Sequence, residues 1–85
     1  MQHRYDDVPG HGRVVLSHHA QDRAEEQQIT DRQIEDVLFE GHDIPDGDST
    51  LREFKGIRVV IITPSPWKGA KLVKTIYKVL PARIH

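Results

Sequence analysis

The sequence predicts an α+β domain in which an N-terminal strand and two helices pack on an antiparallel sheet of three to four strands. A short β-prone run comes first, and two helical segments follow it. The remainder of the chain alternates between apolar runs and turn signals. Because helices and most strands occupy separate parts of the chain, we expect a separate antiparallel sheet rather than repeating βαβ units.

The first half of the chain is expected to form an arm, one strand and two helices. Residues 1–12 are polar and aperiodic, which predicts a flexible N-terminal arm outside a single domain of residues 13–85. Residues 13–16 are β-prone, and Ser17 is suited to cap a helix over 18–28. Thr30 and Gln33 match a capping box before an apolar stripe, which predicts a second helix over 31–40 with Gly41 as a left-handed cap.

The second half is expected to supply the sheet. Residues 42–50 are rich in turn formers, whereas 51–54 and 57–63 flank Lys55-Gly56 and predict a hairpin. Two prolines exclude 64–69 from the interior of a sheet, and 71–80 is expected to be the last strand. Alternation in this strand predicts one set of side chains as the buried face and leaves Lys74 and Lys78 on the opposite face. The predicted buried set is Val73, Thr75, Tyr77 and Val79.

The composition excludes several classes of protein. The 85 residues allow one domain, with 36% apolar and 29% charged residues. The absence of cysteine excludes a disulfide, a thiolate nucleophile and any Cys-ligated metal site. No apolar run is long enough for a membrane span. We therefore expect a cytoplasmic protein, monomeric or homodimeric, with no membrane partner.

The charges are distributed unevenly along the chain. Residues 1–53 hold all 13 carboxylates and five arginines, whereas residues 54–85 hold seven lysines and arginines and no carboxylate. Two interpretations are open. The two halves neutralise each other within one fold, or the basic half binds nucleic acid or an acidic protein.

Three side chains of the first predicted helix form a candidate catalytic group. His19, Arg23 and Glu26 follow one another at i+4 and i+3, which places them on one face. A histidine can transfer protons, a guanidinium can hold a phosphate, and a carboxylate can orient the guanidinium. These parts suit cleavage of a phosphodiester without a metal ion. A solvated helix face with an Arg23–Glu26 ion pair is the alternative interpretation.

The segment Ser17-x-His19-Ala20-x-x-Arg23-x-x-Glu26-x-x-Ile29, followed by Thr30 and the apolar stripe, resembles a small bacterial family catalogued as domain of unknown function 4258. The similarity extends over residues 13–80 and includes the closing Lys74-Thr75-Ile76-Tyr77. That family is grouped with RelE-like, colicin-like and barnase-like ribonuclease toxins. The resemblance implies a helical N-terminal half on a twisted antiparallel sheet, the RelE-like toxin fold. Gln27-Gln28 stands where the family usually has Arg-Gly.

The resemblance also implies metal-independent RNA cleavage by attack of the 2′-hydroxyl. His19 would act as general base or acid, Arg23 would stabilise the charge at phosphorus, and Glu26 would orient Arg23 or share the proton transfer. RNA and a cognate antitoxin or immunity protein are the expected partners. A non-catalytic interaction module of the same fold, which binds an acidic protein or nucleic acid, is the alternative from another class.

Four further residues are candidates for binding the RNA. Lys74 and Lys78 would hold the backbone with Tyr77, and Trp67 in the Gly/Pro loop would stack on a base. Lysines that protect a sheet from pairing, and a tryptophan that covers the core, are the structural alternatives. We expect no metal ion and no cofactor, since the chain has no His-Glu-x-x-His motif and no phosphate-binding or dinucleotide-binding glycine pattern.

Overall fold

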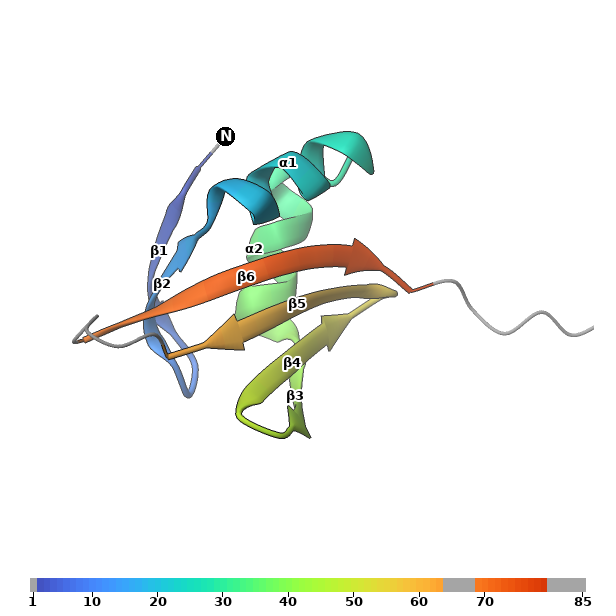
Figure 1. Ribbon diagram of the computed structural model, residues 1–85. Helices are drawn as coiled ribbons and strands as arrows, with labels where there is room; N and C mark the ends of the chain where they lie inside the picture. The colour runs from blue at the N-terminus through green and yellow to red at the C-terminus, as the bar shows by residue number, and fades with distance from the viewer. Residues whose placement is uncertain (1, 64–68, 80–85) are drawn as a thin grey trace, which may run out of the picture.

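The computed structural model describes residues 2–63 and 69–79, and shows one six-stranded sheet with two helices (Figure 1). The elements in chain order are β1 Arg4–Val8, β2 Gly12–Leu16, α1 His18–Glu26, α2 Asp31–Glu40, β3 His42–Asp46, β4 Ser49–Phe54, β5 Ile57–Ile62 and β6 Ala70–Lys78. No helix in these described ranges is long and apolar enough to cross a membrane.

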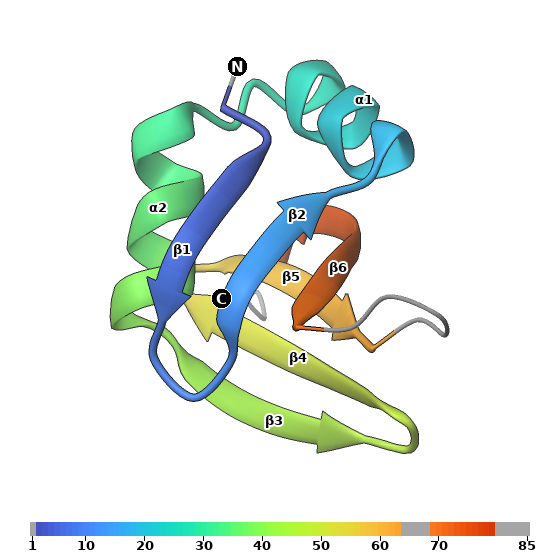
Figure 2. The same ribbon diagram turned by 90° about the vertical axis from the view of Figure 1, so that its left-hand side faces the viewer.

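The strand order is β1-β2-β6-β5-β4-β3. All neighbouring strands are antiparallel except β2 and β6, which run in parallel. The helix α2 lies across one face of the sheet, and α1 lies beside β6 (Figures 1 and 2). The core lies between this face and the helices, and its fully buried side chains include Val14, Ile34, Leu38, Val59 and Ile76. We call the other face, which no described helix covers, the open face.

The predicted fold class is wrong in the size and composition of the sheet. The sheet has six strands instead of three or four, and it is mixed rather than antiparallel. The prediction places a single strand before the two helices. The structure has two strands there, β1 and β2, which form a hairpin at one edge of the sheet. Residues 4–8, which the sequence analysis assigned to a flexible arm, are β1, and Tyr5 and Val8 belong to the core.

Local irregularities explain why these strands escaped detection. In β1 the pairing shifts between Tyr5 and Val8, and Asp7 has a φ of 59°, so the buried residues lie three apart instead of two. The strand β3 contains Pro45 and two aspartates, which are unusual inside a sheet but tolerated at an edge. Residues 42–50 therefore form an edge strand and a tight turn rather than a link.

The second helix has the predicted bounds, and the capping box of Thr30 and Gln33 is present. The predicted left-handed cap at Gly41 is wrong, because its φ is −74° and its ψ is 175°. A Cβ at Gly41 would lie 2.4 Å from the Val37 carbonyl oxygen and 2.8 Å from that of Glu53. Glycine is required here by the close passage of α2 against β4.

The predicted burial of the last strand is also wrong beyond Val73. The register with β5 shifts so that Ile61 pairs with Val73 and Val60 pairs with Thr75. Lys74 is the additional residue of this bulge and is exposed. Beyond it, Ile76 is buried, whereas Thr75 and Tyr77 are on the open face. A bulge reverses which side chains point to each face of the sheet beyond it. The alternation of residues in the sequence alone does not reveal where such a bulge lies.

Candidate active site on the open face of the sheet

The helix α1 takes the place of a neighbouring strand along the second half of β6. Pairing between β2 and β6 ends at Leu16 and Val73. From there Ser17 continues the contacts, since its backbone N–H donates to the Val73 carbonyl at 3.1 Å and its hydroxyl donates to the Lys74 carbonyl at 3.0 Å. Ser17 also caps α1 by accepting a hydrogen bond from the N–H of Ala20.

The side chain of Gln27 completes this attachment at the other end of α1. Its Nε2 donates to the Ile76 carbonyl at 3.1 Å, and its Oε1 accepts from the Lys78 N–H at 2.8 Å. One amide side chain thus satisfies a donor and an acceptor of the free edge of β6. Gln27 is therefore the residue that fixes the end of α1 to the sheet.

The position of Gln27 decides which way the candidate catalytic side chains face. Ala20 and Ala24 are fully buried in the core. Successive residues of a helix are rotated by about 100° around its axis. Gln27 therefore lies about 20° from Ala20, on the side away from Ala24, and Arg23 lies further round on that same side. Because Gln27 contacts the edge of β6 and the alanines contact the core, the flank beyond Gln27 turns toward the open face. This flank holds Arg23, His19 and Glu26.

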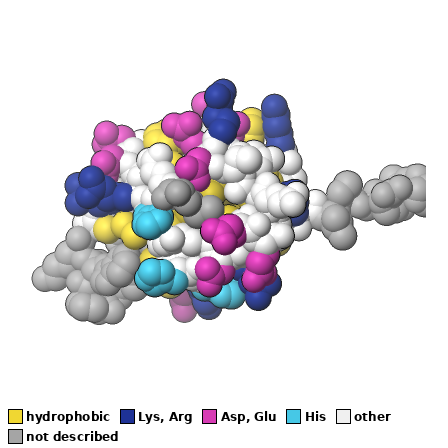
Figure 3. Space-filling view, turned by 90° about the horizontal axis from the view of Figure 1, so that it is seen from above, with side chains coloured by type: hydrophobic (Ala, Val, Ile, Leu, Met, Phe, Trp, Pro, Cys, Tyr) yellow, Lys and Arg dark blue, Asp and Glu magenta, His cyan; other side chains and the backbone are white. Residues whose placement is uncertain are grey.

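All three of these side chains are exposed. Arg23 Nη1 lies 3.2 Å from Glu26 Oε1, so the predicted ion pair is present. In residues 2–63 and 69–79 no hydrogen bond or ion pair involves the side chain of His19, which leaves its ring available to a ligand. Seen from the side of α1 in Figure 3, histidine, acidic and basic side chains are interspersed rather than grouped by sign.

The open face also carries a row of three polar side chains on neighbouring strands. Tyr77 pairs with Arg58 across β6 and β5, and Arg58 pairs with Glu53 across β5 and β4. Arg58 Nε donates to Glu53 Oε1 at 2.5 Å. The pKa of the Arg58 guanidinium is raised by hydrogen bonding to Glu53 and then to Tyr77, which keeps it charged. Spacing along the sequence does not single out Arg58 or Glu53, because only the strand register brings them beside Tyr77.

The predicted RNA-binding residues do not all lie together. Tyr77 is on the open face with Arg58. Lys74 is exposed at the bulge of β6. Lys78 lines a groove at the β4–β5 hairpin end of the sheet, together with Gln33 of α2. Trp67 lies outside the described residues.

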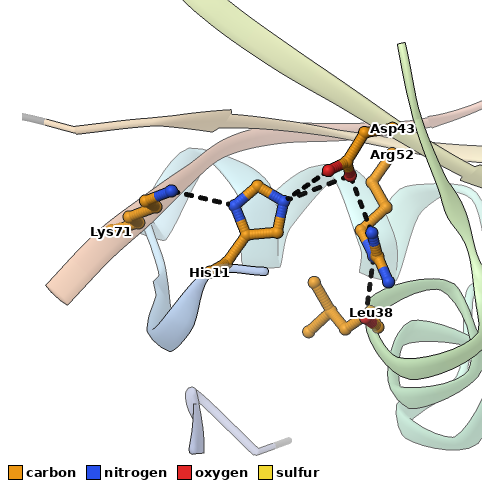
Figure 4. A network of polar contacts seen from close by, with 5 residues as sticks. All are labelled: His11, Leu38, Asp43, Arg52 and Lys71. Atoms are coloured by element: carbon orange, nitrogen blue, oxygen red, sulfur yellow. Dashed lines mark hydrogen bonds and ion pairs between the residues drawn. The ribbon is translucent and has the colours of Figure 1, made fainter. Parts of the chain in front are cut away.

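A second polar cluster, on the helix-covered face, brings together residues from five separate parts of the chain (Figure 4). His11 Nε2 lies 3.1 Å from Asp43 Oδ1, and Lys71 Nζ lies 3.0 Å from His11 Nδ1. Asp43 Oδ1 also accepts from Arg52 Nη1 at 2.7 Å, and Arg52 Nε donates to the Leu38 carbonyl at 2.8 Å. The side chains of His11 and Arg52 are only 4% and 7% exposed.

The contacts of this cluster indicate a structural role. Both ring nitrogens of His11 are engaged, which leaves no free lone pair for proton transfer to a ligand. Arg52 satisfies a carbonyl at the end of α2, and Asp43 neutralises its charge. Burial raises the pKa of Asp43, but hydrogen bonds from Arg52 and His11 outweigh it, so the pKa lies below its ordinary value of 3.8. No spacing in the sequence signals this cluster, since its members meet only through the sheet.

The described residues contain no group of three or more His, Cys, Asp and Glu side chains arranged to hold a metal ion. Comparison of the chain with family models, with curated proteins and with solved structures finds no match.

Proposed function

We propose that this protein cleaves RNA by attack of the 2′-hydroxyl, at a site between the exposed flank of α1 and the row of Glu53, Arg58 and Tyr77. The observation that carries the proposal is the attachment of α1 to β6 through Gln27, which turns His19 toward the face that holds Tyr77. This arrangement supplies a free imidazole, two guanidinium groups and a phenol beside an open surface.

The imidazole and the two guanidinium groups act in the reaction, and the phenol of Tyr77 would bind the RNA backbone. His19 accepts the proton of the 2′-hydroxyl while its oxygen attacks phosphorus. Arg23 and Arg58 stabilise the additional negative charge on the phosphoryl oxygens. The bond from phosphorus to the 5′ oxygen breaks, and this oxygen takes up a proton from solvent water. The products carry a 2′,3′-cyclic phosphate and a 5′-hydroxyl, and Glu26 holds Arg23 in place through their ion pair.

The same face supports a second candidate function, a binding module without catalysis. Apolar side chains on five strands point away from the helices and are only half-buried: Val15, Ile44, Leu51, Val60, Ile62 and Leu72. Apolar surface of this kind is typical of a protein or nucleic-acid contact. A folded protein that binds RNA on this face without cleaving it would favour the second candidate.

A cleavage assay in the presence of EDTA tests the first candidate. Wild-type protein is incubated with single-stranded RNA and with the same strand carrying a 2′-O-methyl group at the cleaved position. We expect cleavage of the unmodified strand with 2′,3′-cyclic phosphate ends and no cleavage of the methylated one. Equal cleavage of both strands, or no cleavage of either, would contradict the proposed reaction.

A further inference from the structure

A groove lies at the β4–β5 hairpin end of the sheet. Its volume is about 600 Å³, and its lining is mostly apolar, with Gly56, Ile57 and Val79 among its residues. This volume falls in the range that binds small organic ligands. Glu53 lines the groove and is also the last member of the row with Arg58 and Tyr77. Lys78, which pairs with the buried Ile57, and Gln33 of α2 line it from the helix-covered side.

The charges around the groove favour an anionic ligand. Lys55 and Lys78 line it, and neither forms an ion pair with another described residue. The carboxylate of Glu53 is already neutralised by Arg58. The groove thus offers two cations and an apolar floor, which suits a flat base next to a phosphate.

Gln33 adds a polar group that can contact the edge of a base. Its side-chain oxygen accepts from the N–H of Thr30 at 2.8 Å in the capping box. This contact fixes the orientation of the amide and leaves its nitrogen without a partner among the described residues. An amide nitrogen held in this way can donate to a base acceptor.

We infer that this groove binds a nucleoside of an RNA strand, with Lys55 and Lys78 on the flanking phosphate. The inference rests on the proposed function, because it takes the ligand to be RNA. Phosphate contacts here are few, so binding depends on the base as well as on charge. An acidic peptide is the competing occupant, since the same two lysines would attract carboxylates.

Binding is measured on the full-length, ¹⁵N-labelled protein with a fully 2′-O-methylated RNA tetranucleotide, which cannot react through a 2′-hydroxyl. We expect amide shifts concentrated at Gly56, Ile57 and Val79. The double variant Lys55→Asn, Lys78→Ala is expected to bind about tenfold more weakly, because two phosphate contacts are lost. Asparagine is chosen because position 55 has a φ of 50°. Arg4→Gln, which removes an exposed cation of the edge strand β1, is the control and should bind like wild type.

The outcomes separate this inference from the proposed function. Shifts in the groove together with a wild type that does not cleave RNA would support the subsite and contradict catalysis. Cleavage by the wild type together with an unaffected groove would contradict the subsite alone. A hexaglutamate peptide that binds the groove more tightly than the tetranucleotide would overturn the inference in favour of an acidic protein partner.

Discussion

At the scale of single residues, the buried polar atoms of this protein fall into two kinds. Arg52 is 5% exposed, and its guanidinium is matched to Asp43 and to the Leu38 carbonyl. Tyr5 is 2% exposed, and its hydroxyl is buried without a hydrogen-bond partner in the described part of the chain. The first kind stabilises one arrangement of the strands, whereas the second costs free energy that a substitution can recover.

The Tyr5 hydroxyl makes stability sensitive to alkaline pH. Burial, followed by the charges of Asp31 and Glu35, raises the pKa of Tyr5 from 10.0 to about 12. As the pH rises, the Tyr5 hydroxyl ionises in the unfolded chain before it ionises in the folded one. Its contribution to the free energy of unfolding is therefore fully present below pH 10, and about 2 kcal/mol is lost as the pH rises from 10 to 12. Tyr5→Phe should remove this loss at alkaline pH, and at pH 7 it should raise the free energy of unfolding by up to about 1 kcal/mol. Urea unfolding of both proteins at pH 7 to 12 measures the difference, and identical pH profiles would refute it.

Asp43 gives the opposite dependence at acid pH. Because its pKa in the folded state is lowered below 3.8, its contribution to stability is present above that pH and is lost as the pH falls through the lower, folded value. Asp43→Asn should have a lower free energy of unfolding than wild type at pH 7. As the pH falls, this variant should lose less stability than wild type, because it lacks the carboxylate that becomes protonated. Asp48→Asn, in the turn between β3 and β4, is the matched control. Chemical unfolding between pH 2 and 7 compares the three proteins. If Asp43→Asn loses as much stability at acid pH as wild type does, the carboxylate of Asp43 does not make this contribution.

How far single residues can be predicted depends on whether their partners are local. The common flank of His19, Arg23 and Glu26 follows from helical spacing, and the ion pair within it is present. The contacts of His11 with Asp43 and Lys71 span 32 and 60 positions and follow from the strand order alone. Sequence spacing carries no information about such a contact.

At the scale of elements, those with strong local sequence signals were predicted correctly, whereas strands with weak signals were missed. The capping box and apolar stripe define α2 correctly, and the Lys55-Gly56 turn marks the β4–β5 hairpin. The strands β1 and β3 lie at the two edges of the sheet, where aspartate, proline and a bulge interrupt the alternation. These interruptions hinder pairing with another chain, and they hide the strands from pattern analysis for the same reason.

The junction of α1 with β6 depends on one side chain. Gln27→Met keeps the length of the side chain but leaves the Ile76 carbonyl and the Lys78 N–H without their partner. We expect a loss of about 1–2 kcal/mol in the free energy of unfolding, because both groups lose a hydrogen bond at a partly buried edge. Glu25→Gln, on the exposed surface of α1, should leave stability unchanged. Urea denaturation measures both, and equal midpoints for the two variants would show that Gln27 does not hold α1.

At the scale of the whole molecule, the parallel pairing of β2 with β6 determines where the candidate site lies. It places the end of β2 beside the middle of β6, so that α1 begins there and follows the free part of the β6 edge. Both edge strands of the sheet carry interruptions that hinder pairing, and no described helix covers the open face beside α1 (Figure 1). The charge asymmetry of the sequence does not separate two surfaces, since the basic β5 and β6 lie in the middle of the sheet.

Metal-free RNA cleavage by two neighbouring histidine variants tests the central claim most directly. His19 lies on the flank that faces the proposed site, whereas the adjacent and equally exposed His18 lies about 100° away on α1. The rate of cleavage in EDTA is measured for wild type, His19→Ala and His18→Ala, with folding of each checked by circular dichroism. We predict that His19→Ala loses at least about 10²-fold in rate and that His18→Ala retains the wild-type rate. Equal rates for the two folded variants, or no cleavage by wild type, would contradict this account.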